Sequence, residues 1–301
     1  MNIVINAALL TAITTGFKMQ FQGALDQAPS QFKMIATVVP SNTKVQTYPW
    51  LGTLPSMREW LGDRVVHGLQ AHGYSITNKG FELTIAVSRN DIEDDQYGVY
   101  GPMFEEMGRA AGAHPDQLTF TALKNGPSTL CYDGQFFFDT DHPVLDATGT
   151  AVSQANWDNN SGSGTAWYLL DTSRAIKPIV FQERKKAQFV AKTALTDDNV
   201  FNANEFVYGV DSRDNVGYGL WQLAYGSRKT LDETNFSAAW TAMAERTGDH
   251  GRPLGIKPNL LIVPPSLYLT ALKVVSADKL ANGADNILKG MVKVEMSPWI
   301  L

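Results

Sequence analysis

The chain has 301 residues, enough for about two domains, and carries a formal net charge of −5. Its apolar content of 44% argues against disorder, and the lack of any long basic run argues against tight binding of nucleic acid. Its one cysteine, Cys131, excludes an intrachain disulfide and a cysteine-rich zinc site, and no apolar run reaches the roughly 18 residues of a membrane span.

Residues 1–30 are predicted to form a helix followed by a polar loop, with Pro29 ending the helix. The segment lacks the basic start of a signal peptide. Helical spacing places four large apolar residues on one stripe, which indicates a helix that packs on the chain's own core or on a partner. The stripe consists of Leu10, Ile13, Phe17 and Phe21. Short strands are predicted at 35–39 and 43–48.

Residues 48–95 form a long excursion that is rich in aromatic residues and arginines and shows no catalytic arrangement. A turn is predicted at 78–80, followed by an alternating strand over 81–87 that buries one face. The excursion ends in an acidic helix entry, Asp91 to Asp95. A segment of this kind usually has another protein chain as its ligand, which favours an assembly over an enzyme.

A long helix is predicted over residues 88–125. Asp91 is predicted to cap it and Pro102 suits its first turn, whereas Pro115 is expected to kink or restart it.

The second half mixes strands and helices irregularly, which predicts an α+β fold. Residues 206–225 are predicted to form a hairpin whose turn lies at 211–215. Buried strands are expected at 167–170, 179–181 and 259–263, and a final strand at 291–296. Helices are expected over 234–247 and from Ser266 onward.

The sequence contains only weak candidates for a catalytic or metal site. Asp139, Asp141 and His142 could ligate a metal or serve a hydrolase, although a turn capped by aspartates explains them as well. Cys131 could pair with His142 as a nucleophile, but a small buried hydrophobic residue is the simpler interpretation. We therefore expect no enzyme activity, no cofactor and no metal.

Several sequence blocks together resemble one family, the major head (capsid) subunits of Mu-like phages, called gpT. The match extends over nearly the whole chain. Its blocks are Tyr48–Gly52, Met57–Trp60, Lys79–Ile85, Gly101–Met103, Phe138–Pro143, Trp167–Asp171, Lys177–Pro178, Tyr208–Arg213 and Gly251–Gly255.

The resemblance implies the tailed-phage capsid fold of the Hong Kong 97 type. On this fold the N-terminal arm is 1–44, the E-loop hairpin is 45–87, and the peripheral domain combines a spine helix at 88–125 with a sheet at 190–230. Residues 126–189 and 231–301 fall mostly in the axial domain. The implied function is an icosahedral head shell, built from pentamers and hexamers of this chain and assembled in the cytoplasm of a host bacterium.

The same resemblance implies partners. They are portal, scaffold or protease and decoration proteins, together with packaged DNA that is contacted only weakly at the inner face, and no membrane. An encapsulin-like compartment shares the fold and is the alternative, and a hydrolase using Asp139, Asp141 and His142 is a third interpretation.

Contacts between subunits are hypothesised on the excursion. Large apolar residues would anchor it on a neighbour, and two arginines would pair with the neighbour's acidic helix entry. The proposed anchors are Trp50, Leu54, Met57 and Trp60, the arginines are Arg58 and Arg64, and the acidic residues are Asp91, Glu93, Asp94 and Asp95.

Overall fold

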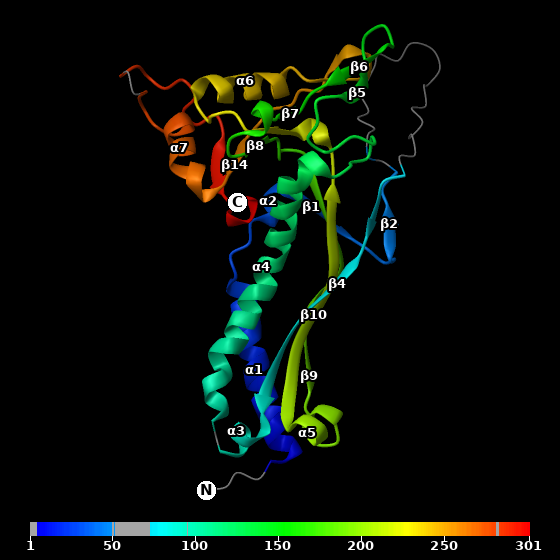
Figure 1. Cartoon of the computed structure of the whole chain (residues 1–301), viewed down its shortest axis with the longest axis vertical. Helices are drawn as coiled ribbons and strands as arrows, with labels where there is room; N and C mark the ends of the chain where they lie inside the picture. Colours follow the sequence, from blue (N-terminus) through cyan, green and yellow to red (C-terminus); the bar gives the residue numbers. More distant parts are fainter. Residues whose placement is uncertain (1–4, 50, 52–72, 95, 281–282) are drawn as a thin grey trace.

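The computed structural model describes residues 5–49, 51, 73–94, 96–280 and 283–301. The chain forms a long, narrow limb and a broader lobe at one end of it (Figure 1). The limb contains α1, α3, α4 and α5 and the strands β4, β9 and β10. The lobe contains a second sheet with α6 and α7. The predicted α+β class is confirmed.

Helix α1 (Ala7–Gln27) shows how the N-terminal sequence encodes the limb. The side chain of Asn6 accepts a hydrogen bond from the Leu9 N–H at 2.9 Å and so caps the helix. All four residues of the predicted stripe are buried, which confirms the stripe. The helix ends just before Pro29, as predicted.

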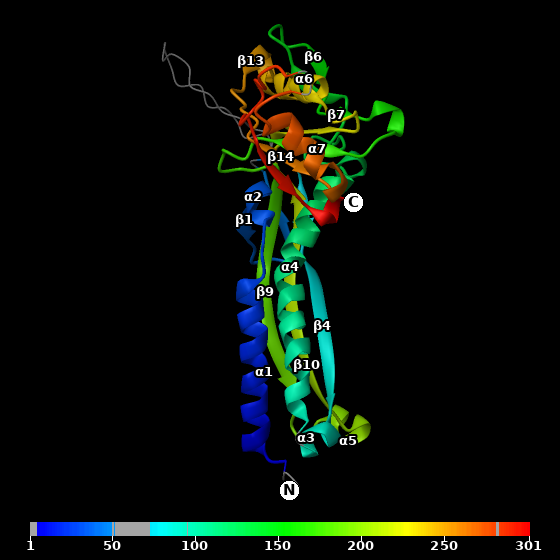
Figure 2. The same ribbon diagram turned by 90° about the vertical axis from the view of Figure 1, so that its left-hand side faces the viewer.

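Helix α4 (Gly101–Asn125) lies beside α1 along the length of the limb (Figure 2). The two helices approach closely because small residues face one another. A Cβ atom added to Gly108 would lie 2.2 Å from the Phe21 carbonyl oxygen and 3.0 Å from the Ala24 Cβ. The absence of a side chain at this point therefore sets the distance between the helices.

The start of the predicted long helix differs from the structure. Residues 89–93 form a separate short helix, α3 (Arg89–Glu93), and a 3₁₀ turn, η1 (Tyr97–Tyr100), precedes α4. Asp91 does not cap the long helix, because its carboxylate accepts a hydrogen bond from the Tyr100 hydroxyl instead. Pro102 does lie in the first turn of α4, as predicted.

Helix α4 continues through Pro115 without a break, so of the two predicted outcomes the restart is wrong. The next residue holds the helix in place by tertiary contacts. The buried Asp116 carboxylate accepts hydrogen bonds from the backbone N–H groups of Gln31 and Phe32, at 2.9 and 2.8 Å, where α2 (Phe32–Ile35) begins. These charge-assisted bonds and the packing on α1 offset the backbone hydrogen bond that proline removes.

The limb sheet has the strand order β1-β9-β10-β4, with β1 parallel to β9 and the other neighbours antiparallel. Its inner face packs on α1 and α4. Phe17 of α1 stacks on Phe104 of α4 at 4.0 Å between ring centroids, and both rings contact Tyr208 of the sheet edge to face. The strands are β1 (Ala36–Pro40), β4 (Lys79–Ser88), β9 (Ile179–Lys192) and β10 (Glu205–Tyr218).

The predicted hairpin at 206–225 is wrong. Residues 205–218 form one continuous strand, β10, which pairs with β4 on one side and β9 on the other. The turn-like residues 211–215 coincide with a shift in the register between β10 and β9, around Arg213. A β-bulge accommodates such residues inside a strand, and two long neighbours outweigh their preference for a turn.

The predicted turn at 78–80 is also wrong, because only Asn78 separates β3 (Ser75–Thr77) from β4. Strand β3 instead pairs with β2 (Val45–Thr47). The alternating strand that was predicted over 81–87 is confirmed as part of β4.

The lobe is built on a five-stranded sheet with the order β15-β14-β8-β11-β7. Its central strands β8 and β14 are buried along their whole length, as predicted. The predicted helices are confirmed as α6 and α7. The elements are β7 (Trp157–Asp158), β8 (Trp167–Leu170), β11 (Ala224–Ser227), α6 (Glu233–Ala244), β14 (Leu260–Val263), α7 (Pro265–Val275) and β15 (Lys293–Met296).

The described part of the chain also contains four shorter strands and one further short α-helix. They are β5 (His142–Leu145), β6 (Ala151–Gln154), α5 (Asp198–Ala203), β12 (Thr247–Gly248) and β13 (Arg252–Pro253).

Gly108→Ala is expected to destabilise the unassembled subunit by about 1–3 kcal/mol, because the new methyl group collides with the backbone of α1. Urea unfolding followed by circular dichroism measures the change. The matched control is Gly16→Ala on the same helix pair, where no atom lies within 4 Å of the added Cβ. The control should stabilise the subunit by about 0.5–1 kcal/mol, and equal effects of the two variants would contradict this account of the helix contact.

Candidate functional site

Helix α3, which carries Asp91 and Glu93 of the predicted contact, lies at the end of the limb that is far from the lobe (Figure 1). Glu93 forms an ion pair with Arg89 at 3.0 Å on the same short helix, and Asp91 is held by Tyr100. Asp94 is exposed. Of the three acids that the structure describes, Asp91 and Glu93 therefore have partners within their own chain, and Asp94 is the exposed one.

The rest of the predicted contact lies outside the described residues. This holds for Trp50, Leu54, Met57, Arg58, Trp60, Arg64 and Asp95. Their proximity to the acidic residues stays a prediction.

The base of the excursion is fixed by a buried polar network that the sequence analysis did not identify. Gln182 of β9 accepts a hydrogen bond from the Tyr48 hydroxyl at 2.7 Å and donates one to the Asn78 side chain at 2.8 Å. Asn78 in turn donates to the Ser41 hydroxyl at 2.9 Å. Because Tyr48 and Asn78 bind the same glutamine, the two ends of the segment between them are held together.

Two tyrosines, Tyr48 and Tyr74, lie at this polar network. Burial, with the nearby Tyr74, raises the pKa of Tyr48 to about 12. Burial likewise raises the pKa of Tyr74 to about 12, although its hydroxyl accepts a hydrogen bond from the Tyr218 N–H at 2.7 Å. Both hydroxyl groups are neutral at physiological pH, so Tyr48 can act as a donor. Its spacing from Gln182 is 134 residues, which is why no local motif reveals the pair.

In the structure, His142 is buried apart from the exposed Asp141, so the three residues of the hydrolase hypothesis do not form a site. A hydrogen bond and the charge of Asp139 raise the pKa of the exposed Asp141 carboxyl. The His142 ring, however, is fully buried, and its Nδ1 lies 2.7 Å from Asp133. The histidine therefore faces the core and leaves the two aspartates without the third group that the hypothesis needs.

Among the described residues, Cys131, Asp133 and His142 form one compact cluster of possible metal ligands, with ligand atoms within 4.8 Å. The Cys131 thiol donates to Asp133 at 3.0 Å. Burial and the charge of Asp133 raise the pKa of this thiol well above its usual range. The arrangement places the carboxylate between the thiol and the imidazole, so it stabilises the thiol and provides no base for a nucleophile.

The carboxylate at the centre of this cluster is ionised. Burial alone would raise the pKa of Asp133, but hydrogen bonds from His142 and Cys131 outweigh it and hold the pKa below its usual value. The hydrogen bonds of the cluster thus account for the arrangement of its three side chains.

Next to this cluster, the ring of Trp221 contacts two side chains. The His142 ring stacks on one face at 3.9 Å, and the Arg246 guanidinium lies 5.3 Å from the ring centroid. Burial lowers the pKa of Arg246 to about 10, and the guanidinium donates to the backbone carbonyl groups of Trp221, Gln222 and Ala224. The buried Trp221 is therefore part of the packing of the core.

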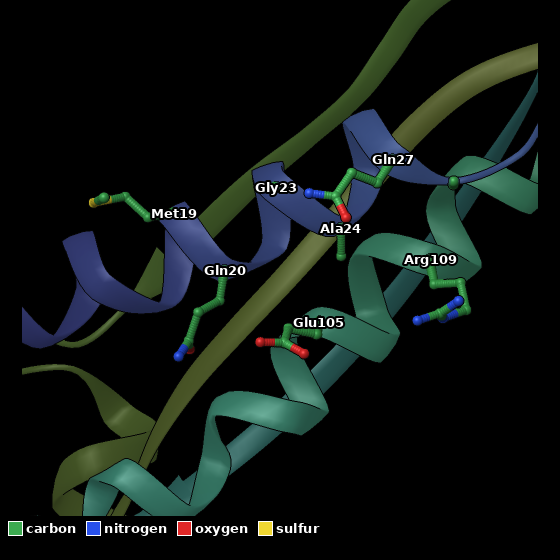
Figure 3. A pocket seen from close by; sticks show the side chains of 8 residues that line it. Met19, Gln20, Gly23, Ala24, Gln27, Glu105 and Arg109 are labelled. Carbon is green, nitrogen blue, oxygen red and sulfur yellow. The ribbon is translucent and has the colours of Figure 1, made fainter.

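A surface groove of about 330 Å³ lies between α1 and α4. Figure 3 shows its side chains coming from both helices, with Gln20 and Gln27 on α1 and Glu105 and Arg109 on α4. The small residues Gly23 and Ala24 form its floor on the α1 side. Its polar lining consists of two amides, one carboxylate and one guanidinium, and Arg109 forms its ion pair with Glu106 outside the groove, at 3.3 Å. The groove contains no nucleophile.

The described residues therefore form a surface groove and buried polar networks, and they show no catalytic arrangement. A family described as Mu-like prophage major head subunit gpT matches residues 10–300. The chain belongs to this Mu-like gpT family. None of the helices described for this family member is both long and apolar enough to cross a membrane.

Two relatives of this gpT-family chain have curated names. The major capsid protein of Escherichia phage Mu is 43% identical over 305 residues, covering 99% of this chain and all of the relative. The Mu-like prophage FluMu major head subunit of Haemophilus influenzae is 46% identical over 291 residues, covering 94% of both chains.

Solved structures give the same result for the fold. A chain from the procapsid of bacteriophage JBD30 superposes with a TM-score of 0.86 at 52% identity, over 98% of this chain and all of the other. A chain from the JBD30 capsid gives 0.79 at 39% identity, over 99% of this chain and all of the other. The expected tailed-phage capsid fold is thereby confirmed.

Gln182→Ala is expected to lower the free energy of unfolding of the unassembled subunit by about 2–4 kcal/mol, because it removes the buried hydrogen bonds that Gln182 forms with Tyr48 and Asn78. Denaturant titration measures this change. Gln188→Ala, at an exposed position of the same strand, is the control and should lie within about 0.5 kcal/mol of the wild type. Similar stabilities for the two variants would show that the network does not hold the excursion.

Proposed function

We propose that this chain is the major capsid protein that assembles into the icosahedral head shell around the genome of a Mu-like tailed phage. The observation that carries the proposal is the superposition on the JBD30 procapsid chain over nearly the full length of both chains. The gpT family match over residues 10–300 supports it. Within this proposal the chain has a structural role and no enzyme activity.

The proposed subunit organisation follows the limb and the lobe. The limb, with α4 as the spine helix, would be the peripheral domain, and the lobe would be the axial domain. Residues 1–44 would be the N-terminal arm, whose helix α1 is part of the limb, and 45–87 would include the E-loop. Because β9 lies in the limb sheet, the peripheral part would begin near residue 179 rather than 190.

We place the assembled protein in the virion, with assembly in the bacterial cytoplasm into pentamers and hexamers. Portal, scaffold or protease and decoration proteins are proposed partners. One of the solved JBD30 structures is a capsid decorated with minor capsid protein trimers, which supports a decoration partner here. An encapsulin-like compartment is less well supported, because the family match is to phage head subunits.

Expression of the chain, together with its scaffold where one is required, is expected to give closed shells of uniform diameter under negative-stain electron microscopy. Size-exclusion chromatography should place the protein in the void volume. A folded chain that stays monomeric or forms only small oligomers under both conditions would overturn the proposed function.

The contact between the excursion and the acidic limb end can be tested by exchanging charges. Arg58→Glu and Asp94→Arg are each expected to lower shell yield by about tenfold, because like charges then meet across the contact. The double variant should recover most of the yield, since opposite charges face one another again. Asp285→Arg, a reversal at an exposed site in the lobe, is the control and should assemble normally.

Shell yield is measured by sedimentation, and Trp60→Ala tests the apolar anchor in the same assay. Normal yield for Arg58→Glu and Trp60→Ala, or a double variant that is no better than the singles, would contradict the assignment of this contact.

A further inference from the structure

Strand β4 forms one edge of the limb sheet. It pairs with β10 along all ten of its residues, and no other strand of the described part of the chain lies on its far side. In an antiparallel pair, every second residue directs its N–H and C=O groups away from the partner. One edge of β4 therefore presents a row of backbone donors and acceptors that another extended chain could bind.

This edge lacks the features that normally prevent pairing with another chain. Strand β4 contains no proline, its register with β10 shows no bulge, and Lys79 and Glu82 are its only charged residues. A long, regular and nearly neutral edge is the kind that adds a further strand.

The opposite side of the same sheet has an edge of a different kind. Strand β1 covers β9 only as far as Glu183, so residues 184–192 also form an edge. That edge carries four cationic residues, and the pairing of β9 with β10 contains register shifts. The four are Arg184, Lys185, Lys186 and Lys192. Lysine-rich, irregular edges resist pairing, so one edge of the sheet is protected and the β4 edge is open.

A small crevice adjoins the open edge of β4. It lies between β4 and α4, has a volume of about 140 Å³ and is lined by Phe81, Leu83, Ala110, Ala111 and Val210 among others. Leu83 is 40% exposed although its side chain lies on the helix-facing side of the strand. A cavity of about 150 Å³ accepts a benzene molecule, so this crevice accommodates one medium-sized apolar side chain.

The rim of the crevice is held in place. His114 of α4 lies 3.1 Å from the buried carboxylate of Asp214 on β10, and its ring packs against Phe81 of β4 at 4.3 Å. These contacts tie the helix to both strands at the mouth of the crevice. The site is therefore formed before any partner arrives, which lowers the entropic cost of binding.

We propose that the free edge of β4 pairs with an extended segment of a second copy of this chain, which also inserts an apolar side chain into the crevice. The proposal rests on the proposed shell function, in which every subunit meets further copies at close range. The near neutrality of the edge suits this occupant, because it creates no repulsion between two chains of equal net charge. Backbone hydrogen bonds supply the attachment, and the crevice fixes the register.

Hydrogen exchange resolved to single amides tests the pairing in unassembled subunits and in shells made of this chain alone. In free subunits, the β4 amides that face β10 should exchange slowly and the alternate amides should exchange fast. In shells, the alternate amides should slow by at least about a hundredfold, whereas the free amides of 184–192 should change little. Fast exchange of the alternate β4 amides in shells would overturn the proposal, as would protection that requires an added second protein.

Leu83→Lys tests the crevice, because it places an inward-pointing charge where the partner's apolar side chain would sit. Its position is partly exposed, so the lysine can reach solvent in the free subunit and leave the fold intact. We expect at least a tenfold rise in the subunit concentration needed for assembly. The matched control is Val190→Lys on the protected edge, at a position that is 46% exposed, and it should assemble within about twofold of the wild type.

Circular dichroism and thermal unfolding of both variants establish that the subunits are folded. Normal assembly of Leu83→Lys would overturn the proposal, as would an equal defect in Val190→Lys. Failure of the wild-type chain to form shells would instead contradict the proposed function, so the two hypotheses fail in different ways.

Discussion

The close contact between α1 and α4 is the constraint on which the rest of the limb depends. Gly108 allows the two helices to approach until the backbone of one meets the other, and both then cover the same face of the limb sheet. The limb has only these two layers, so its core is thin and relies on stacked aromatic rings such as Phe17 and Phe104. A thin, rigid limb leaves long sheet edges and helix faces available to neighbours, which suits a subunit of a shell.

The elements with strong local patterns were predictable from the sequence, whereas those decided by distant partners were not. The stripe on α1 and the apolar runs of β8 and β14 follow from periodicity and burial alone. Strand β10 was interpreted as a hairpin because residues 211–215 have the composition of a turn, and only its two long neighbours override that preference. Helix α4 similarly survives Pro115 because Asp116 binds the start of α2.

In the candidate contact, too, the residues with a local pattern were predictable and those with distant partners were not. The composition of residues 48–95 pointed to the excursion and to Asp94, but not to Gln182, which holds the base of the excursion. A buried glutamine within a strand has no local signature, because its partners are set by tertiary structure. Likewise, the inward orientation of His142 depends on Asp133 and Trp221, so the sequence left open a hydrolase interpretation that the geometry does not support.

The continuity of β10 has a mechanical consequence. This single strand runs from the far end of the limb to Tyr218, whose ring stacks on Phe137 at the lobe, and it is hydrogen-bonded on both sides for most of its length. Tension along the limb would load both ladders in shear, so that many hydrogen bonds must break together rather than one after another. A wall made of such limbs would resist stretching in the direction of its strands while its loops yield first.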